Sequence, residues 1–210
     1  MFDAATLIAY SAAAALLVAI PGPGTAWIVA QTISGGRRRG LRAALGLETA
    51  TLIHALAAAL GLSAVLATSA LAFDIVKYLG AAYLVWLGIQ AWRSGAPATD
   101  PAAPAAPMGG GGVYLRSVLT GVLNPKVAIF FIAFLPQFVR PERGHVLLQF
   151  LVLGAILAAI GFTGSVLVSW GVARMGRRLS ASPRWERWQR RLTGTLFVGL
   201  GMRLALQQRG

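Results

Sequence analysis

The chain contains no cysteine, and only six of its 210 residues are acidic and two are histidine. Without cysteine there can be no disulfide, thiolate metal site or thiol redox relay. So few carboxylates and imidazoles provide few ligands for a metal ion. A membrane-embedded enzyme would need paired carboxylates or an activated nucleophile, and the sequence shows neither. We therefore expect no metal, no cofactor and no enzymatic activity.

Charged residues are also scarce, at 12% of the chain, which is about half the fraction typical of a soluble domain. Hydrophobic residues make up 57% and fall in long runs, and runs of about 20 such residues span a bilayer as α-helices. The short alternating segments of a transmembrane barrel are missing. The predicted fold class is therefore an all-α integral membrane protein embedded in a lipid bilayer.

Six transmembrane helices are predicted, at residues 6–34, 41–67, 75–92, 114–139, 146–173 and 192–206. Residues 95–112 hold four prolines and end in four consecutive glycines, a composition typical of a flexible linker. We accordingly divide the chain into a first three-helix half at 1–92, a Pro/Ala/Gly-rich cytoplasmic linker at 93–113 and a second three-helix half at 114–210. Because each half has an odd number of helices, the two halves are expected to be inverted in the membrane.

The net charge of +13 is of a size that can indicate nucleic-acid binding. Here the arginines cluster between the apolar runs, as expected if they set membrane orientation, so no nucleic-acid partner is predicted. Thirteen of the 19 basic residues fall on one side of the predicted bundle and five on the other. The richer side should be cytoplasmic, which places both termini outside the cytoplasm. Residues 1–6 lack the basic start of a signal peptide, and we expect them to be retained.

Two of the predicted helices carry an interruption near their middle. Proline lacks an N–H group and clashes with the preceding turn, and backbone groups freed in hydrocarbon need partners or a water-lined cavity. Broken helices at matching places in inverted halves are typical of the substrate site of a secondary transporter, with ordinary proline kinks as the alternative. We predict that helices 1 and 4 are broken mid-span and that the breaks bind substrate through Pro21, Gly22, Pro23, Gly24, Asn124, Pro125 and Lys126.

Three ionisable side chains fall inside the predicted helices. Lys126 lies well within its span, where a cation is costly unless it faces a cavity or a partner; a tether to a carbonyl or to Glu48 is the alternative. Glu48 and His54 lie in the second helix, and such a pair suits a proton relay. The alternatives are snorkelling of Glu48 towards the arginines and a packing role for His54. Eight glycines in the spans, including Gly46 and Gly161, are assigned to close helix packing.

Several of these segments resemble the LysE/RhtB family, the lysine exporter and homoserine/threonine resistance type. In the first half the resemblance rests on Pro21-Gly22-Pro23-Gly24-Thr25, on the glycine-arginine loop at 35–41, and on residues 46–62 and 77–88. In the second half it rests on Asn124-Pro125-Lys126, on the phenylalanine-rich run at 130–138 and on residues 199–205. The resemblance implies six helices, export of amino acids or close analogues across a bacterial inner (plasma) membrane, and the proton gradient as the energy source.

Two positions depart from the family's pattern. Many members have asparagine where this chain has Gly24, and many have an acidic residue where it has Thr51. We therefore assign proton coupling to Glu48 and His54 instead of Thr51. The expected protein is a proton-antiporting amino-acid exporter that works by alternating access, and a homodimer is compatible with this assignment. The alternatives are an exporter of an inorganic cation or another small metabolite on the same architecture, and a passive channel.

Overall fold

The computed structural model describes residues 1–19, 21–68 and 109–175, together with scattered helical positions between 78 and 93 and between 191 and 202. Every secondary-structure element within these ranges is helical, which agrees with the predicted all-α class. The third and sixth predicted helices, most of the linker and the basic segment after residue 175 lie largely outside the described residues.

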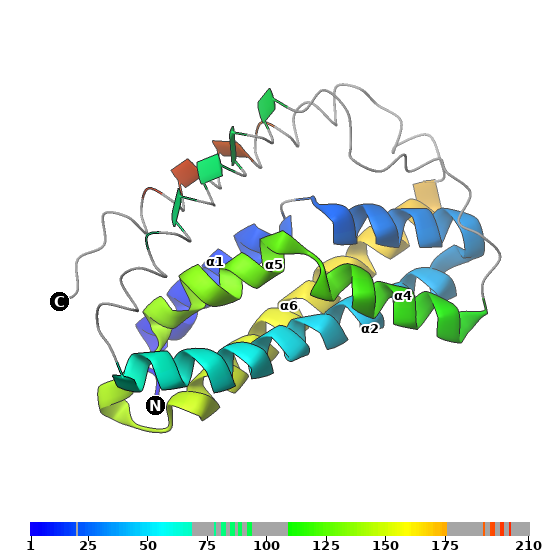
Figure 1. Ribbon diagram of the computed structural model, residues 1–210. Helices are drawn as coiled ribbons and strands as arrows, with labels where there is room; N and C mark the ends of the chain where they lie inside the picture. The colour runs from blue at the N-terminus through cyan, green and yellow to red at the C-terminus, as the bar shows by residue number, and fades with distance from the viewer. Residues whose placement is uncertain are drawn as a thin grey trace.

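The described ranges form a bundle of long helical runs (Figure 1). The elements in chain order are α1 (Ala4–Ala19), α2 (Pro23–Thr68), α4 (Gly110–Val122), α5 (Pro125–Ile129), the π-helix η1 (Phe130–Phe134), the 3₁₀ helices η2 (Leu135–Phe138) and η3 (Pro141–Arg143), and α6 (Val146–Met175). Two of them, α2 and α6, contain stretches long and apolar enough to cross a membrane. The bent run from α4 to η2 is a third candidate span if it is counted as one.

Both predicted interruptions separate helices. α1 ends at Ala19 and α2 begins at Pro23, while α4 and α5 meet at a bend of 48°. At this bend Asn124 has an extended backbone, and its side-chain oxygen accepts a hydrogen bond from the Lys126 backbone N–H at 3.1 Å. Asparagine before the first helical residue and proline at the first position are both favourable at a helix start. The Asn-Pro-Lys sequence therefore starts a new helix.

α2 consists of two segments joined at a sharp turn. Only Gly35 and Gly36 leave helical geometry, and Gly36 has a φ of +71°, which glycine adopts without the steric cost that other residues meet. The sequence predicted a loop over residues 35–41, but the observed turn is shorter. Two glycines reverse the chain, so Arg37 already belongs to the second segment. Gly40 then packs directly against the side chains of Thr32 and Ser169.

α4 begins at Gly110, four residues before the predicted start of the fourth helix at 114, so the last residues assigned to the linker at 93–113 are helical. Glycine is a weak helix former, but here it allows close packing, because a Cβ atom at Gly110 would collide with the Arg42 guanidinium. Val113, one turn later, is fully buried. Contact with α2 therefore outweighs the low helix propensity of the glycines.

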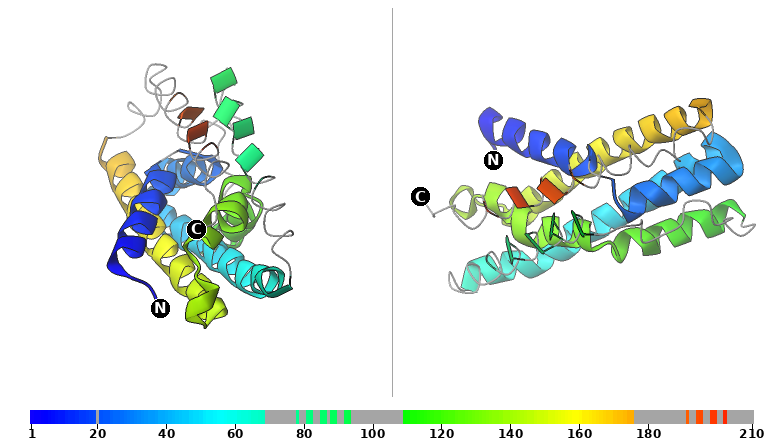
Figure 2. Two further views of the ribbon diagram at one scale, coloured as in Figure 1. Left: turned by 90° about the vertical axis from the view of Figure 1, so that its left-hand side faces the viewer. Right: turned by 90° about the horizontal axis from the view of Figure 1, so that it is seen from above.

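The second segment of α2 is flanked by α6 on one side and by α4 on the other (Figures 1 and 2). Small residues at the contact points bring the backbones close. A Cβ atom at Gly46 would lie 2.5 Å from the Tyr114 carbonyl oxygen, and one at Gly121 would lie 2.5 Å from the Ala50 Cβ. The packing role predicted for Gly46 is therefore confirmed.

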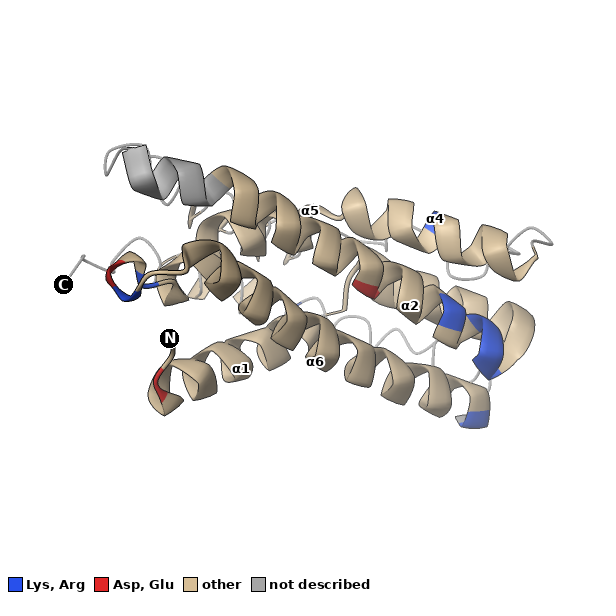
Figure 3. Cartoon of the chain, turned by 90° about the horizontal axis from the view of Figure 1, so that it is seen from below, with Lys and Arg blue, Asp and Glu red and all other residues tan. Residues whose placement is uncertain are grey.

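The two ends of the bundle differ in charge (Figure 3). Basic residues gather where the second segment of α2 begins and where α6 ends, at Arg37, Arg38, Arg39, Arg42 and Arg174. At the opposite end Asp3 forms ion pairs with Arg140 at 3.6 Å and with Arg143 at 3.5 Å. Charges that gather at both ends of a mostly apolar bundle are the pattern of a membrane-crossing protein.

Candidate functional site

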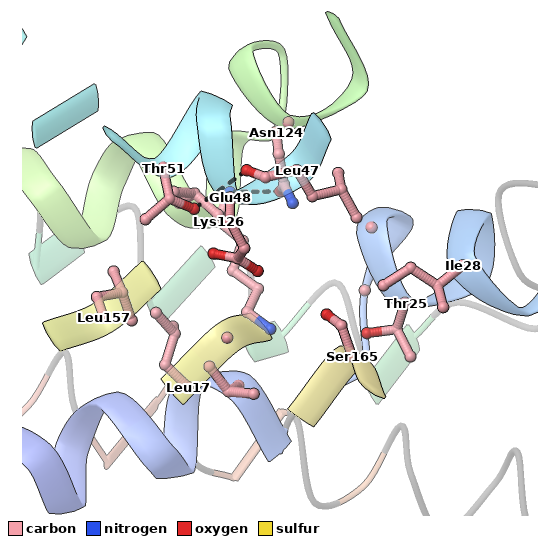
Figure 4. Close-up of a pocket in the computed structure, with 16 residues that line it drawn as sticks. Leu17, Thr25, Ile28, Leu47, Glu48, Thr51, Asn124, Lys126, Leu157 and Ser165 are labelled. Carbon is pink, nitrogen blue, oxygen red and sulfur yellow. Dashed lines mark hydrogen bonds between the residues drawn. The ribbon is translucent and has the colours of Figure 1, made fainter. Parts of the chain in front are cut away.

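A cavity of about 90 Å³ lies between the two helix breaks (Figure 4). Gly22 and Thr25 reach it from the first break, and Asn124 and Lys126 reach it from the second. Glu48 enters from the second segment of α2, while α6 supplies the opposite wall. The fold therefore brings the two breaks, which are about 100 residues apart in the sequence, to one place.

Lys126 bridges the two breaks. Its backbone N–H is held by the Asn124 side chain, and its half-buried side chain extends into the cavity (Figure 4). A Cβ atom built on Gly22 would lie 3.6 Å from the lysine Cδ and 3.9 Å from its Nζ. The lysine side chain thus lies beside the Pro-Gly segment, with room between them for a methyl group at ordinary contact distance.

The Glu48 carboxylate lies in the same cavity, against α6. A Cβ atom on Gly161 would be only 2.6 Å and 2.8 Å from the two carboxylate oxygens. Thr51, one turn further along α2, is buried and donates its hydroxyl to the Leu47 carbonyl at 3.2 Å. Glu48 therefore points into the bundle instead of snorkelling towards the arginines, which decides between the two orientations considered for it.

The rest of the cavity wall combines small polar and apolar side chains. Ser165 on α6 is buried and faces the cavity, which Thr25 also lines (Figure 4). Leu17, Leu157 and Val127 line it with hydrocarbon. A ligand inside would therefore meet one cationic group, one anionic group, a few hydroxyl and amide groups, and an apolar surface.

The structure separates the predicted site residues into three sets. Those that line the cavity are Gly22, Gly24, Asn124, Lys126 and Glu48. The three prolines, Pro21, Pro23 and Pro125, are absent from the lining and act by interrupting or restarting the helices.

His54 forms the third set, because it is not in the cavity lining. Its Nε2 lies 3.3 Å from the Gly121 carbonyl oxygen, and its ring stacks on Phe131 with 5.9 Å between ring centroids. This carbonyl belongs to the end of α4, where it also accepts a hydrogen bond from the Asn124 backbone N–H at 3.1 Å. His54 therefore contacts the second break from outside the cavity.

Sequence reasoning missed Thr25, Ser165 and the cavity role of Gly161. Thr25 directly follows the Pro-Gly motif, so its position was a usable signal. Ser165 lies four residues after Gly161 in α6, which places the two on one helix face. Nothing in the sequence alone shows which face of α6 meets Glu48, and this is why Gly161 was assigned to packing.

Comparisons with known proteins agree on one family. The sequence profile of the LysE type translocators matches residues 15–208. An uncharacterised membrane protein of Vibrio cholerae is 37% identical over 94% of this chain and 95% of its own length. A homoserine/homoserine lactone efflux protein of Salmonella typhimurium is 34% identical over 94% of each chain. A leucine efflux protein of Enterobacter sp. is 30% identical over 93% of each.

No solved structure matches the chain. The family profile nonetheless covers nearly all of the sequence, including both helix breaks, Glu48 and the whole of α6. The chain therefore belongs to the LysE-type translocators and is a membrane transporter, not an enzyme.

Proposed function

We propose that this protein exports small neutral amino acids from the cytoplasm by proton antiport, and that it binds them in the cavity between the two broken helices. The observation that carries the proposal is that Lys126 and Glu48, of opposite charge, line the same small cavity as both breaks. A free α-amino acid at neutral pH also carries one positive and one negative group on neighbouring atoms. The cavity thus matches the charge pattern of that class of molecule.

The carboxylate of the substrate is assigned to Lys126. A lysine ammonium forms charge-assisted hydrogen bonds with carboxylates, and the N-terminal end of a helix adds a positive partial charge. The substrate's own ammonium is assigned to the Glu48 carboxylate. The side chain then lies against the apolar wall that includes Leu17 and Leu157.

The size of the cavity favours a compact substrate. Its volume of about 90 Å³ is far below the roughly 300–1,000 Å³ of pockets for drug-sized ligands. Relatives carry the names homoserine/homoserine lactone efflux protein and leucine efflux protein, and homoserine and leucine are both small neutral amino acids. A long cationic side chain such as that of lysine would place a second positive charge near Lys126.

Glu48 is proposed as the proton-coupling group. A deprotonated Glu48 attracts the substrate ammonium, whereas a protonated Glu48 has lost that attraction and releases it, so proton and substrate compete for one carboxylate. His54 is proposed to take part through its contact with the second break, at the Gly121 carbonyl. The proton gradient supplies the energy, and no cofactor enters this cycle.

The wider architecture belongs to the same proposal: six helices in two inverted halves, alternating access, and both termini outside the cytoplasm of a bacterial inner membrane. Support comes from the two breaks that meet at the cavity. Further support is the basic end of the described bundle, which the positive-inside rule assigns to the cytoplasm. A homodimer is compatible with it, and a size measurement in detergent tests that assembly.

Export of an inorganic cation fits the site less well. Within residues 1–19, 21–68 and 109–175, no group of three His, Cys, Asp or Glu side chains gathers that could hold a metal ion. Glu48 would be the sole carboxylate ligand among the cavity-lining residues, and Lys126 in the same small space would repel a cation.

The test is counterflow in proteoliposomes loaded with L-homoserine, with and without a pH gradient. We expect transport that the pH gradient accelerates and that free L-leucine inhibits. Leucine methyl ester lacks the carboxylate, and the 2-hydroxy acid analogue of leucine lacks the ammonium, so each should inhibit poorly. If analogues with one charged group inhibit as well as the amino acids, the two-charge recognition is wrong. If no amino acid is transported, the proposed function is wrong.

A further inference from the structure

The second segment of α2 and α6 pack antiparallel in a regular register. Three contacts mark it: Gly40 with Ser169, Glu48 with Gly161, and Ala55 with Gly154. Successive contacts are seven or eight residues apart on both helices, which is about two helical turns. At each contact at least one partner is glycine, so a Cβ atom added there would collide with the other helix.

The middle contact differs from the other two in chemistry. At Gly154 the added Cβ would meet the methyl group of Ala55, and at Gly40 it would meet two hydroxyl groups. At Gly161 its three nearest neighbours would all belong to the carboxyl group of Glu48, with Oε1 at 2.6 Å, Oε2 at 2.8 Å and Cδ at 2.9 Å. The carboxylate therefore lies against Gly161 at the wall of the cavity.

We propose that Gly161 is a positioning residue: its missing side chain sets the place of the Glu48 carboxylate and thereby the subsite for the substrate ammonium. This inference rests on the proposed function. A methyl group at 161 displaces the carboxylate along the free direction, into the cavity and towards the space that the substrate occupies. The distance between the anionic and cationic poles then no longer matches an α-amino acid.

A glycine that only allows close helix packing behaves differently. Its replacement by alanine separates the helices, lowers the amount of folded protein and leaves the affinity for substrate unchanged. Gly154 provides the matched control, because it packs on the same helix in the same register but contacts Ala55 outside the cavity. Gly171 provides a second control, since a Cβ atom there would contact nothing within 4 Å.

The experiment compares G161A, G154A and G171A in the L-homoserine proteoliposome assay, with rates divided by the amount of folded protein. We expect the KM of G161A to rise about tenfold, the effect of weakening a hydrogen bond to a charged group. G154A and G171A should keep the KM of the parent. An unchanged KM in G161A would overturn the inference.

The double variant E48D/G161A provides a rescue that a packing role does not allow. Aspartate is shorter by one methylene, so its carboxylate retreats from the added methyl group. We expect the KM of E48D/G161A to lie below that of G161A, although E48D alone raises it. Additive losses in this double-mutant cycle would contradict the proposal.

These outcomes are separable from a failure of the proposed function. If the parent protein transports no amino acid, the exporter assignment fails. If the parent transports L-homoserine but G161A and G154A both leave its KM unchanged, only the positioning role of Gly161 fails.

Discussion

Replacing Lys126 by methionine should impair transport without lowering stability. Methionine keeps an unbranched chain that can pack beside Gly22. A Cβ atom added to Gly22 would lie 3.6 Å from the present lysine Cδ. It removes the ammonium, whose presence in the middle of a membrane span costs roughly 2.5–3.5 kcal/mol on the lenient insertion scale. The variant should therefore insert as well as the parent and unfold no more easily.

Transport should suffer because the substrate carboxylate loses its charged partner. A hydrogen bond to a charged group contributes about 1.5–3 kcal/mol, which corresponds to a loss of roughly 10- to 150-fold in transport kcat/KM. Arginine at 126 should restore only part of the activity, since its planar fork is larger than the compact ammonium.

The assay is efflux from cells loaded with dipeptides, normalised to the amount of protein in the membrane. Arg116→Met is the matched control, because it removes a cation from α4 on an exposed face outside the cavity. We expect this control to export at nearly the parental rate. Lys126→Met exporting at the parental rate would refute the reasoning, and the two breaks would then be structural kinks.

Three further predictions concern coupling and topology. Glu48→Gln should abolish the acceleration of export by a pH gradient, because the amide cannot exchange a proton; parental pH dependence would exclude Glu48 from coupling. His54→Ala should lower stability by about 1 kcal/mol, the value of one hydrogen bond, and the proposed coupling role also predicts a shifted pH profile. If only stability falls in this variant, His54 holds the second break and nothing more. A reporter that is active only in the cytoplasm, fused after Gly210, should be silent, and a bright signal would invert the proposed orientation.

The sequence was sufficient for the helical class and for both breaks, because proline and glycine act through local backbone chemistry. The Pro-Gly motif ends α1, and Asn124 starts α5 by capping it. Local signals were less reliable for boundaries. The glycines at 110–112 read as linker, whereas they form the first turn of α4, with Gly110 beside Arg42 of a distant segment.

The sequence pointed to site residues only where burying the residue in a membrane costs free energy. Lys126 and Glu48 were noticed because charge inside a membrane is expensive. Gly161 and Ser165 carry no such cost, and their roles arise from the register between α2 and α6. That register is a tertiary property which periodicity within one helix does not specify. His54 is the opposite case. It was predicted as a site residue because it is polar and lies inside a span, but it faces the Gly121 carbonyl instead of the cavity.

The absence of cysteine from the chain makes the central claim directly measurable. Ser165 lies in the cavity wall, and Ser165→Cys changes only a hydroxyl to a thiol. The measurement is the rate at which a small water-soluble thiol reagent modifies this variant, with and without saturating L-homoserine, beside Ser34→Cys at the basic end of the bundle. Bound substrate between Lys126 and Glu48 should slow the labelling of Ser165→Cys and leave that of Ser34→Cys unchanged. Equal labelling of Ser165→Cys with and without substrate, in protein that still transports it, would contradict the account.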